Sequence, residues 1–336
     1  MMSRLEIIDE GILYINPNPA YRNPAAFFPN IVQLSDQEFI CLYQIGEGMY
    51  SIDSNIALQR SIDGGVTWRD EGILYDLSKD DRPWSYHSTF VSQMSDGTLV
   101  ACPFRADRSD PAQPFFNDTG GLIAIEPLFL VSKDNGLSWT DPVPMALQEP
   151  LQSTPAQSII ELADGRWLAA FDLWTTFDDH RPYQPCMVTF ASDDQGQTWK
   201  DRVVMADGAA DGKGFWHGRP LRLSDDRLFS LLWSADMTEP AKGPVDLPIH
   251  YTCADASGIP VQTLPDGNGI RRSLQTFPAK PTAPPNCRTD DLPPYTPGAK
   301  RIRRALWSYH LTTADTPGIS KIKFKCGMPL AGPTLA

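Results

Sequence analysis

The sequence predicts an all-β fold, built from four-stranded sheets that repeat about every 60 residues. The first observation is an octet of the form S-x-D-x-G-x-[TS]-W, which occurs as SIDGGVTW (61–68), SKDNGLSW (132–139) and SDDQGQTW (192–199). A second turn series lies between the octets: LSDQEF (34–39), MSDGTL (94–99), LADGRW (162–167) and LSDDRL (223–228). Both series keep the same spacing, and repeats of this length are typical of propellers and solenoids.

The third observation is a set of short runs rich in β-branched, aromatic and aliphatic residues within each repeat. In the third repeat these runs are QSIIEL, WLAAFDLW, CMVTFAS and, after the octet, RVVMA. Four short strands with turns between them make one propeller blade. A helical interpretation fails because apolar residues do not recur at helical spacing and prolines interrupt nearly every candidate segment.

The octet itself predicts a closed turn between the third and fourth strands of a blade. Its Asp accepts hydrogen bonds from backbone amides just after it, and its Ser does so more weakly. Its Gly tolerates a positive φ, and its Trp anchors the fourth strand. The second series marks the turn from strand one to strand two, which lies on the same face. Catalytic or binding residues are therefore expected on the opposite face, where the longer loops are.

This repeated octet resembles the Asp-box (BNR) repeat of the sialidase superfamily of six-bladed β-propellers. The resemblance covers roughly residues 10–262, or four blades within a domain of residues 1–263, with CADASGIPV (253–261) as a degenerate fourth copy. It implies an exo-α-sialidase-like glycosidase that hydrolyses a terminal sialic acid or related acidic sugar without a metal or other cofactor. A non-catalytic carbohydrate-binding propeller, or a hydrolase of a different sugar, is the alternative. A protein-interaction propeller is a third, less favoured interpretation.

Arginines on the expected loop face are the candidates for binding an acidic sugar. Tyr21-Arg22-Asn23-Pro24 resembles the R-I-P motif of sialidases, with Asn23 in place of Ile, and in that family the Arg clamps the sugar carboxylate. A guanidinium presents a planar fork of donors that matches a carboxylate. Arg219 at the comparable place in the fourth repeat and Arg105 in the second are further candidates.

Aromatic and histidine side chains beside the predicted first strands are also candidates for sugar binding. They are His87, in the second repeat, and the pair Trp216 and His217, in the fourth. A Trp can stack on the apolar face of a sugar ring. An equally weighted interpretation is a Trp that packs between blades beside a His with satisfied hydrogen bonds.

Acidic side chains on the same face are the candidates for catalysis. Sialidases use an Asp shortly before the first Asp-box, and Asp53 is the nearest acid of that kind, with Glu47 second. The other acids expected on this face are Glu126, Asp172, Asp178 and Asp179. An oxocarbenium-like transition state requires at least two carboxyl groups or one with a Tyr nucleophile. The Tyr of the family belongs to a late blade, and no Glu that would activate it is identifiable in the fourth repeat.

The repeat ends at about residue 263. Residues 264–336 hold eleven Lys and Arg against four Asp and Glu, with 11 of the 31 prolines. This segment replaces the fifth and sixth blades that the resemblance implies. A shifted reading frame near 263–270 is the favoured explanation. A natural linker with a basic segment (KRIRR, 300–304) and two divergent blades are the alternatives.

The overall charge of −12 for 336 residues argues against nucleic acid or an anionic membrane as the partner. No signal peptide or transmembrane segment is recognisable at the sequence level, which predicts a cytoplasmic location. The six cysteines are widely spaced and predict buried free thiols. A carbohydrate or glycoconjugate is therefore the expected partner.

Overall fold

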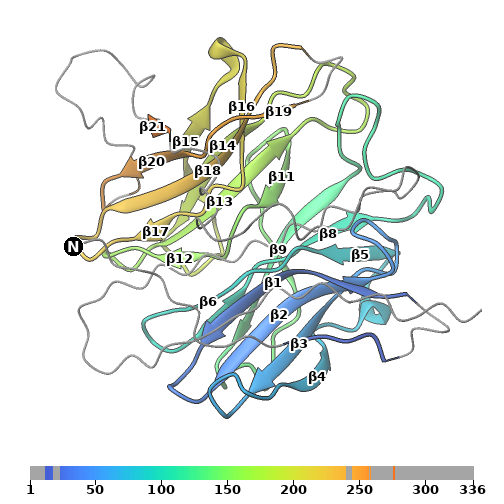
Figure 1. Cartoon of the computed structure of the whole chain (residues 1–336), viewed down its shortest axis with the longest axis vertical. Coiled ribbons are helices and arrows are strands. Elements are labelled where there is room, and N and C mark those ends of the chain that lie inside the picture. The colour runs from blue at the N-terminus through green and yellow to red at the C-terminus, as the bar shows by residue number, and fades with distance from the viewer. Residues whose placement is uncertain (1–11, 18–22, 240–243, 257, 259–274, 277–336) are drawn as a thin grey trace, which may run out of the picture.

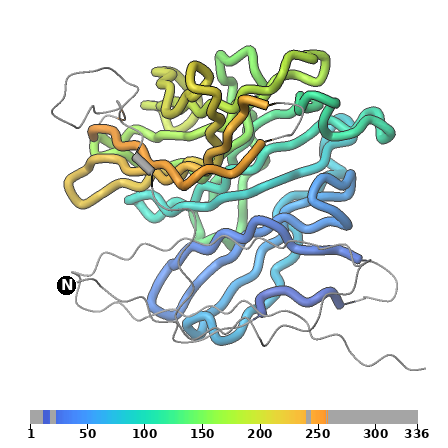
Figure 2. The backbone as a smooth tube through the Cα atoms, turned by 45° about the horizontal axis from the view of Figure 1, so that its top comes forward, coloured from blue at the N-terminus to red at the C-terminus, as the bar shows by residue number. Residues whose placement is uncertain are grey.

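The computed structural model describes residues 12–17, 23–239, 244–256, 258 and 275–276. These residues form four antiparallel β-sheets that follow one another as the blades of a propeller (Figure 1). Blade one lies at the lower end of the assembly, and blades two, three and four follow it above (Figure 2). The predicted all-β propeller fold is confirmed. The atypical segment 264–336 lies outside the described residues apart from Gln275–Thr276.

Blade one is a four-stranded meander in the order β1-β2-β3-β4. Its strands are β1 (Ala25–Gln33), β2 (Phe39–Gly46), β3 (Asn55–Ser61) and β4 (Arg69–Ile73). The turn series LSDQEF joins β1 to β2, and the first octet joins β3 to β4, as the repeat pattern predicts. A short 3₁₀ helix, η1 (Leu77–Lys79), follows on the way to blade two.

Blade two has the same plan, but its two inner strands are each divided into two pieces. These pieces are β5 (Trp84–His87) with β6 (Val91–Gln93), and β7 (Leu99–Ala101) with β8 (Phe104–Asp107). The outer strands are β9 (Ile125–Ser132) and β10 (Val143–Pro144). The first strand breaks at Ser88, whose φ of 39° takes it out of the β region.

Blades three and four also have a divided first strand, but their second strands are continuous. Blade three contains β11 (Gln152–Pro155), β12 (Ile160–Glu161), β13 (Trp167–Trp174), β14 (Cys186–Ser192) and β15 (Lys200–Asp207). After the 3₁₀ helix η2 (Ala209–Asp211), blade four contains β16 (Lys213–Trp216), β17 (Leu221–Arg222), β18 (Leu228–Asp236), β19 (Val245–Asp246), β20 (His250–Ala254) and β21 (Gln275–Thr276). The runs WLAAFDLW and CMVTFAS coincide with β13 and β14.

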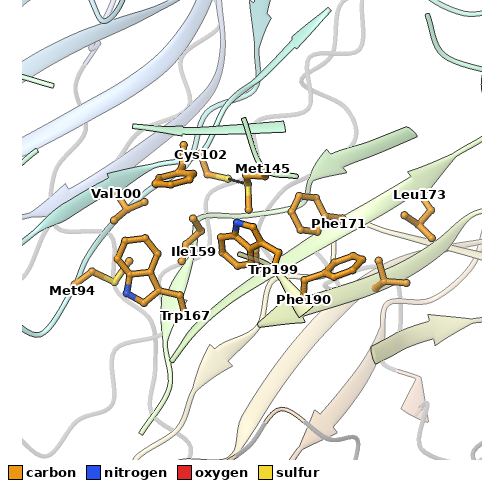
Figure 3. Close-up of a cluster of buried hydrophobic side chains, with 13 residues drawn as sticks. Met94, Val100, Cys102, Met145, Ile159, Trp167, Phe171, Leu173, Phe190 and Trp199 are labelled. Carbon is orange, nitrogen blue, oxygen red and sulfur yellow. Dashed lines mark hydrogen bonds between the residues drawn. The ribbon is translucent and has the colours of Figure 1, made fainter. Parts of the chain in front are cut away.

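The hydrophobic core consists of layers between successive blades. In the layer between blades two and three, Cys102 and Met145 of blade two face Trp167, Phe171 and other side chains of blade three (Figure 3). An equivalent layer joins blades one and two. The second strands of blades one and three, β2 and β13, are buried almost throughout, whereas the second strand of blade four, β18, is only partly buried. The packed blades form a rigid support for the loops that join their strands.

The three complete octets share one hydrogen-bonded turn. In the first, the Ser61 hydroxyl donates to Asp63 (2.8 Å), and Asp63 accepts from the amide and hydroxyl of Thr67 (2.9 and 2.6 Å). Hydrogen bonds from Thr67 lower the pKa of Asp63 to about 2. The turns at Asp134 and Asp194 repeat these contacts. The octet carboxylates are therefore used within their own turns.

Candidate functional site

The loops between second and third strands lie at the end of the blades opposite the octets, and we call this side the loop face. The loops are residues 47–54, 108–124, 175–185 and 237–249, of which 240–243 are outside the described residues. The first strands of blades two, three and four are each broken, at residues 88–90, 156–159 and 217–220. These segments carry Asp53, Asp178, Asp179, His217 and Arg219, whereas the other described candidates lie on the adjoining strands.

The strongest arrangement on the loop face joins blades three and four through Asp172 and His217. Asp172 on β13 is only 2% exposed and accepts from the backbone amide of His217 (2.8 Å). Its other oxygen is 3.1 Å from Nδ1 of His217, whose side chain is 53% exposed. The imidazole lies flat against the Trp233 ring, 5.7 Å away at 10°. A buried carboxylate thus fixes a solvent-facing imidazole beside an indole.

The local backbone explains why His217 takes this position. His217 does not lie at the start of a strand, as the sequence suggested, but at the break between β16 and β17 with a φ of 54°. A non-glycine residue in this conformation carries strain, which the surrounding contacts must offset. The two contacts with Asp172 supply that stabilisation. Trp216, one residue earlier, is buried and its Nε1 donates to the Tyr183 hydroxyl (2.9 Å).

Aromatic side chains form a connected row along the loop face. Trp174 stacks on Tyr183 (4.6 Å, 9°), Tyr183 contacts Trp216 (6.2 Å), and Trp216 contacts Trp233 (5.2 Å). Phe116 extends the row from Trp174 (5.8 Å) into blade two. Burial, together with the nearby carboxylate of Asp172, raises the pKa of Tyr183 well above its ordinary value. Tyr183 is therefore a neutral phenol at physiological pH.

Arg105 and Glu126 form a second pair, within blade two. The Arg105 guanidinium donates to Glu126 (2.8 Å) and to the buried carboxylate of Asp80 (3.1 Å), and it lies 4.2 Å from the Trp84 ring centre. Two carboxylates already neutralise this guanidinium. Arg105 is thus an internal ion-pair partner in the structure rather than an open clamp for a substrate carboxylate.

His87 lies in the interior below the loops of blades one and two. Its Nε2 is 2.7 Å from the Ser85 hydroxyl, and the ring stacks on Phe104 (5.4 Å). Burial, reinforced by the positive charge of Arg108, lowers the pKa of His87 to about 3. The buried, neutral ring presents no surface to a sugar, which runs against its predicted role as a substrate-binding side chain.

Arg108 was missed by sequence reasoning. It follows β8 and is 5% exposed, and its Nε and Nη2 donate to the Ser85 hydroxyl (2.7 Å) and the Tyr50 carbonyl (2.8 Å). Arg105, three residues earlier, drew the prediction because it opens the long loop of blade two. No local signal distinguishes the two arginines, since their partners come from distant segments of the chain.

Of the other predicted site residues, Asp53 and Arg219 lie among the described residues and Arg22 does not. Asp53 is exposed and accepts from the Glu47 amide (3.2 Å), which closes the loop of blade one. Arg219 is half-buried with its guanidinium 4.9 Å from the Phe90 ring centre, near the break in the first strand of blade two. Arg22 lies outside the described residues.

Asp178 and Asp179 lie on the loop of blade three. Asp178 is exposed, and Asp179 binds Arg181 (2.5 Å). Across the described ranges, no group of three or more His, Cys, Asp and Glu side chains is placed to hold a metal ion. In the same part of the chain, no helix is long and apolar enough to cross a bilayer.

Several solved structures are similar to this chain, although no protein-family model and no curated protein matches it. A protein of unknown function from Dyadobacter fermentans aligns over 75% of this chain and 70% of its own, with a TM-score of 0.58 and 17% identity. A Hadza microbial sialidase aligns over 70% of this chain and 47% of its own, with a TM-score of 0.51 and 16% identity. The α-L-arabinanase of Penicillium chrysogenum, complexed with arabinobiose, aligns over 70% of this chain and 66% of its own, with a TM-score of 0.51 and 14% identity.

Likenesses at these identities establish the fold, which is that of a β-propeller. The chain spans less than half the length of the sialidase and about two thirds of the arabinanase. The function of the chain therefore has to be argued from its own loop face.

Proposed function

We propose that the chain is a glycoside hydrolase that acts on a terminal sialic acid or a related acidic sugar bound at the loop face. The observation that carries the proposal is the arrangement of Asp172, His217 and Trp233. The Trp233 indole is 40% exposed, and its Nε1 donates to Asp246 (3.0 Å), which fixes the ring at the surface. An indole held in this way offers an apolar surface on which a sugar ring stacks.

Asp172 determines which nitrogen of His217 is available for chemistry. A carboxylate accepts hydrogen bonds but does not donate them, so the hydrogen of the neutral imidazole lies on Nδ1, toward Asp172. Nε2 is then left with a lone pair on the exposed side of the ring. In this proposal Nε2 takes a proton from an attacking water or, when protonated, donates one to the leaving oxygen.

The acidic group of the sugar is assigned to Arg219 in this proposal. Arg219 lies two residues after His217, at the same break in the first strand of blade four, and its guanidinium extends to Phe90 of blade two. Arg22 remains a proposed second member of the clamp. Arg105 is less suited to the clamp because Glu126 and Asp80 already bind it. Asp53 and Glu126 remain the proposed further carboxyl groups.

The test is hydrolysis of a panel of fluorogenic glycosides: a sialoside, an arabinofuranoside and a glucoside. We expect turnover of the sialoside, and a loss of about 10²–10⁴-fold in kcat/KM for His217→Ala if His217 transfers a proton. His180→Ala is the matched control, because His180 is an exposed histidine on the neighbouring loop and should leave the rate unchanged.

Three other outcomes change the conclusion. Turnover of the arabinofuranoside alone would replace the acidic substrate with a neutral one. Binding of sialic acid without turnover, lost in Trp233→Ala, would make the protein a carbohydrate-binding propeller. Activity that survives His217→Ala, Trp233→Ala and Asp172→Asn together would place the chemistry elsewhere.

A further inference from the structure

Arg108 is a buried cation that lacks a counter-ion. Its guanidinium makes two hydrogen bonds, to the Ser85 hydroxyl and the Tyr50 carbonyl, and lies 5.0 Å from the Phe115 ring centre. Among the described residues, no carboxylate lies within 4.0 Å of it, in contrast to Arg60 and Arg105, which each bind two. All of its observed partners are neutral.

This arrangement is costly for the protein alone. Arginine does not lose its proton at physiological pH, and an unpaired buried charge costs several kcal/mol of free energy relative to water. Neutral oxygens satisfy two of the five N–H donors but do not cancel the charge. Burial accordingly lowers the pKa of Arg108.

The titratable neighbours of Arg108 provide no negative charge either. Burial and the Arg108 charge keep His87 neutral, with a pKa of about 3. Burial raises the pKa of Tyr50, so its phenol is also neutral. The cluster of Arg108, Ser85, His87 and Tyr50 therefore carries one net positive charge inside a predominantly aromatic environment.

We propose that Arg108 is the centre of a binding site for a small oxyanion, located where the loops of blades one and two meet. Two of its five N–H donors are used, and the remaining three include the fork geometry that binds a carboxylate or sulfate through two oxygens. The site is separate from Arg219, which lies in blade four. The oxyanion is either a free anion from solution or the acidic group of a bound ligand, and the shared chemistry is a planar or tetrahedral oxyanion.

The site is tested by unfolding the full chain in urea at constant ionic strength, with increasing acetate, sulfate or N-acetylneuraminate. We expect a saturable rise in the urea midpoint for the wild type and for the control Arg181→Gln, a substitution of an exposed arginine on the same face. Arg108→Gln should weaken anion binding by at least about tenfold and remove that rise. General salting-out by sulfate affects all three proteins equally and cancels in the comparison.

A second readout separates charge from packing. The pKa of His87, followed by NMR of its ring proton, should rise when sulfate, which stays ionised at the pH where His87 titrates, neutralises Arg108, and it should also rise in Arg108→Gln. Arg108→Lys keeps the positive charge and should retain a response to anions. This variant tests the proposal if Arg108→Gln does not fold.

The responses also identify the source of the anion. A response to acetate and sulfate that N-acetylneuraminate does not share indicates a free ion. A stronger response to N-acetylneuraminate than to its methyl ester indicates a ligand carboxylate. Equal anion responses in the wild type, Arg108→Gln and Arg108→Lys, with an unchanged pKa of His87, would overturn the proposal. Because these measurements follow binding, they stand even if no glycoside in the panel is hydrolysed.

Discussion

Two arginines, Arg60 near the octets and Arg108 on the loop face, are buried to nearly the same degree, with 4% and 5% of their surface exposed. Arg60 binds Glu71 (2.9 Å) and Glu38 (2.6 Å) and also donates to the Asn135 carbonyl in the octet of blade two (2.9 Å). Arg108 has only neutral partners. The same residue type is thus neutralised in one region and left charged in the other.

The difference separates the support of the fold from its functional surface. Burial alone would lower the pKa of Arg60, but Glu71 and Glu38 outweigh burial and raise it. At Arg108 nothing opposes burial, and the pKa falls. At Arg60 two carboxylates balance the buried charge, whereas the loop face contains a buried charge that no described carboxylate balances. Perturbed charges of this kind concentrate at functional sites.

The largest expected effect is the contrast between Arg60→Met and Arg108→Met. Arg60→Met leaves the partly buried Glu71 without its main partner and removes a link between blades one and two, so it should destabilise the fold by about 3–5 kcal/mol. Arg108→Met removes an uncompensated charge and should change the unfolding free energy by less than about 1 kcal/mol, or stabilise the protein. Urea unfolding in a buffer of low anion content measures both.

Arg69→Met is the control for the general cost of such a substitution, because Arg69 binds Glu71 from an exposed position. It should cost at most about 1 kcal/mol. If Arg108→Met proves as destabilising as Arg60→Met, the guanidinium of Arg108 is a structural element, and the contrast between the two regions fails.

The next effect is a loss of stability in mild acid caused by His87. Its pKa is about 3 in the folded protein and about 6.5 when unfolded, so the unfolded chain binds more protons between these values. Stability should be fully present above pH 6.5 and fall as the pH is lowered, by about 1.4 kcal/mol per pH unit well inside this window.

His87→Phe should remove most of this pH dependence between pH 6.5 and 4.5 and leave only the part due to His250, whose pKa burial also lowers. The octet carboxylates do not interfere, because their lowered pKa values confine their contribution to lower pH, with loss of stability from about pH 4 to about 2. Equal pH profiles for the wild type and His87→Phe would show that His87 is accessible to protons and not held by the Arg108 cluster.

The sequence was sufficient for the fold because the signals for a blade are local. A strand such as β13 shows its own run of apolar and aromatic residues, and each octet carries every side chain that closes its turn. In the degenerate fourth copy, of which residues 253–256 and 258 are described, the Gly258 amide donates to the Asp255 carbonyl (3.0 Å). Local interactions of this kind are encoded within a few neighbouring residues.

The site was less predictable because its interactions join distant residues. Asp172 and His217 were both candidates, but nothing in the sequence indicates that residues 45 positions apart form a pair. The sequence suggested Arg105 rather than Arg108 as a substrate-binding arginine. In the structure Arg105 is neutralised by Asp80 and Glu126, which are 25 and 21 residues away in the sequence. The pairs of side chains that form the site depend on which loops lie next to each other. The packing of the blades determines this, and no sequence motif encodes it.

The smallest expected effect concerns how tightly the octets are packed against neighbouring blades, and it compares Gly196→Ala with Gly165→Ala. Both glycines have nearly the same positive φ, 87° and 86°, so the backbone cost of a Cβ is the same for both, about 1 kcal/mol. A Cβ at Gly165 meets no atom within 4 Å, whereas one at Gly196 lies 2.9 Å from the Phe129 ring of blade two. Gly196→Ala should therefore cost about 1–3 kcal/mol more than Gly165→Ala in urea unfolding. Equal costs would mean that Gly196 does not need its close approach to Phe129 for the third octet to pack against blade two.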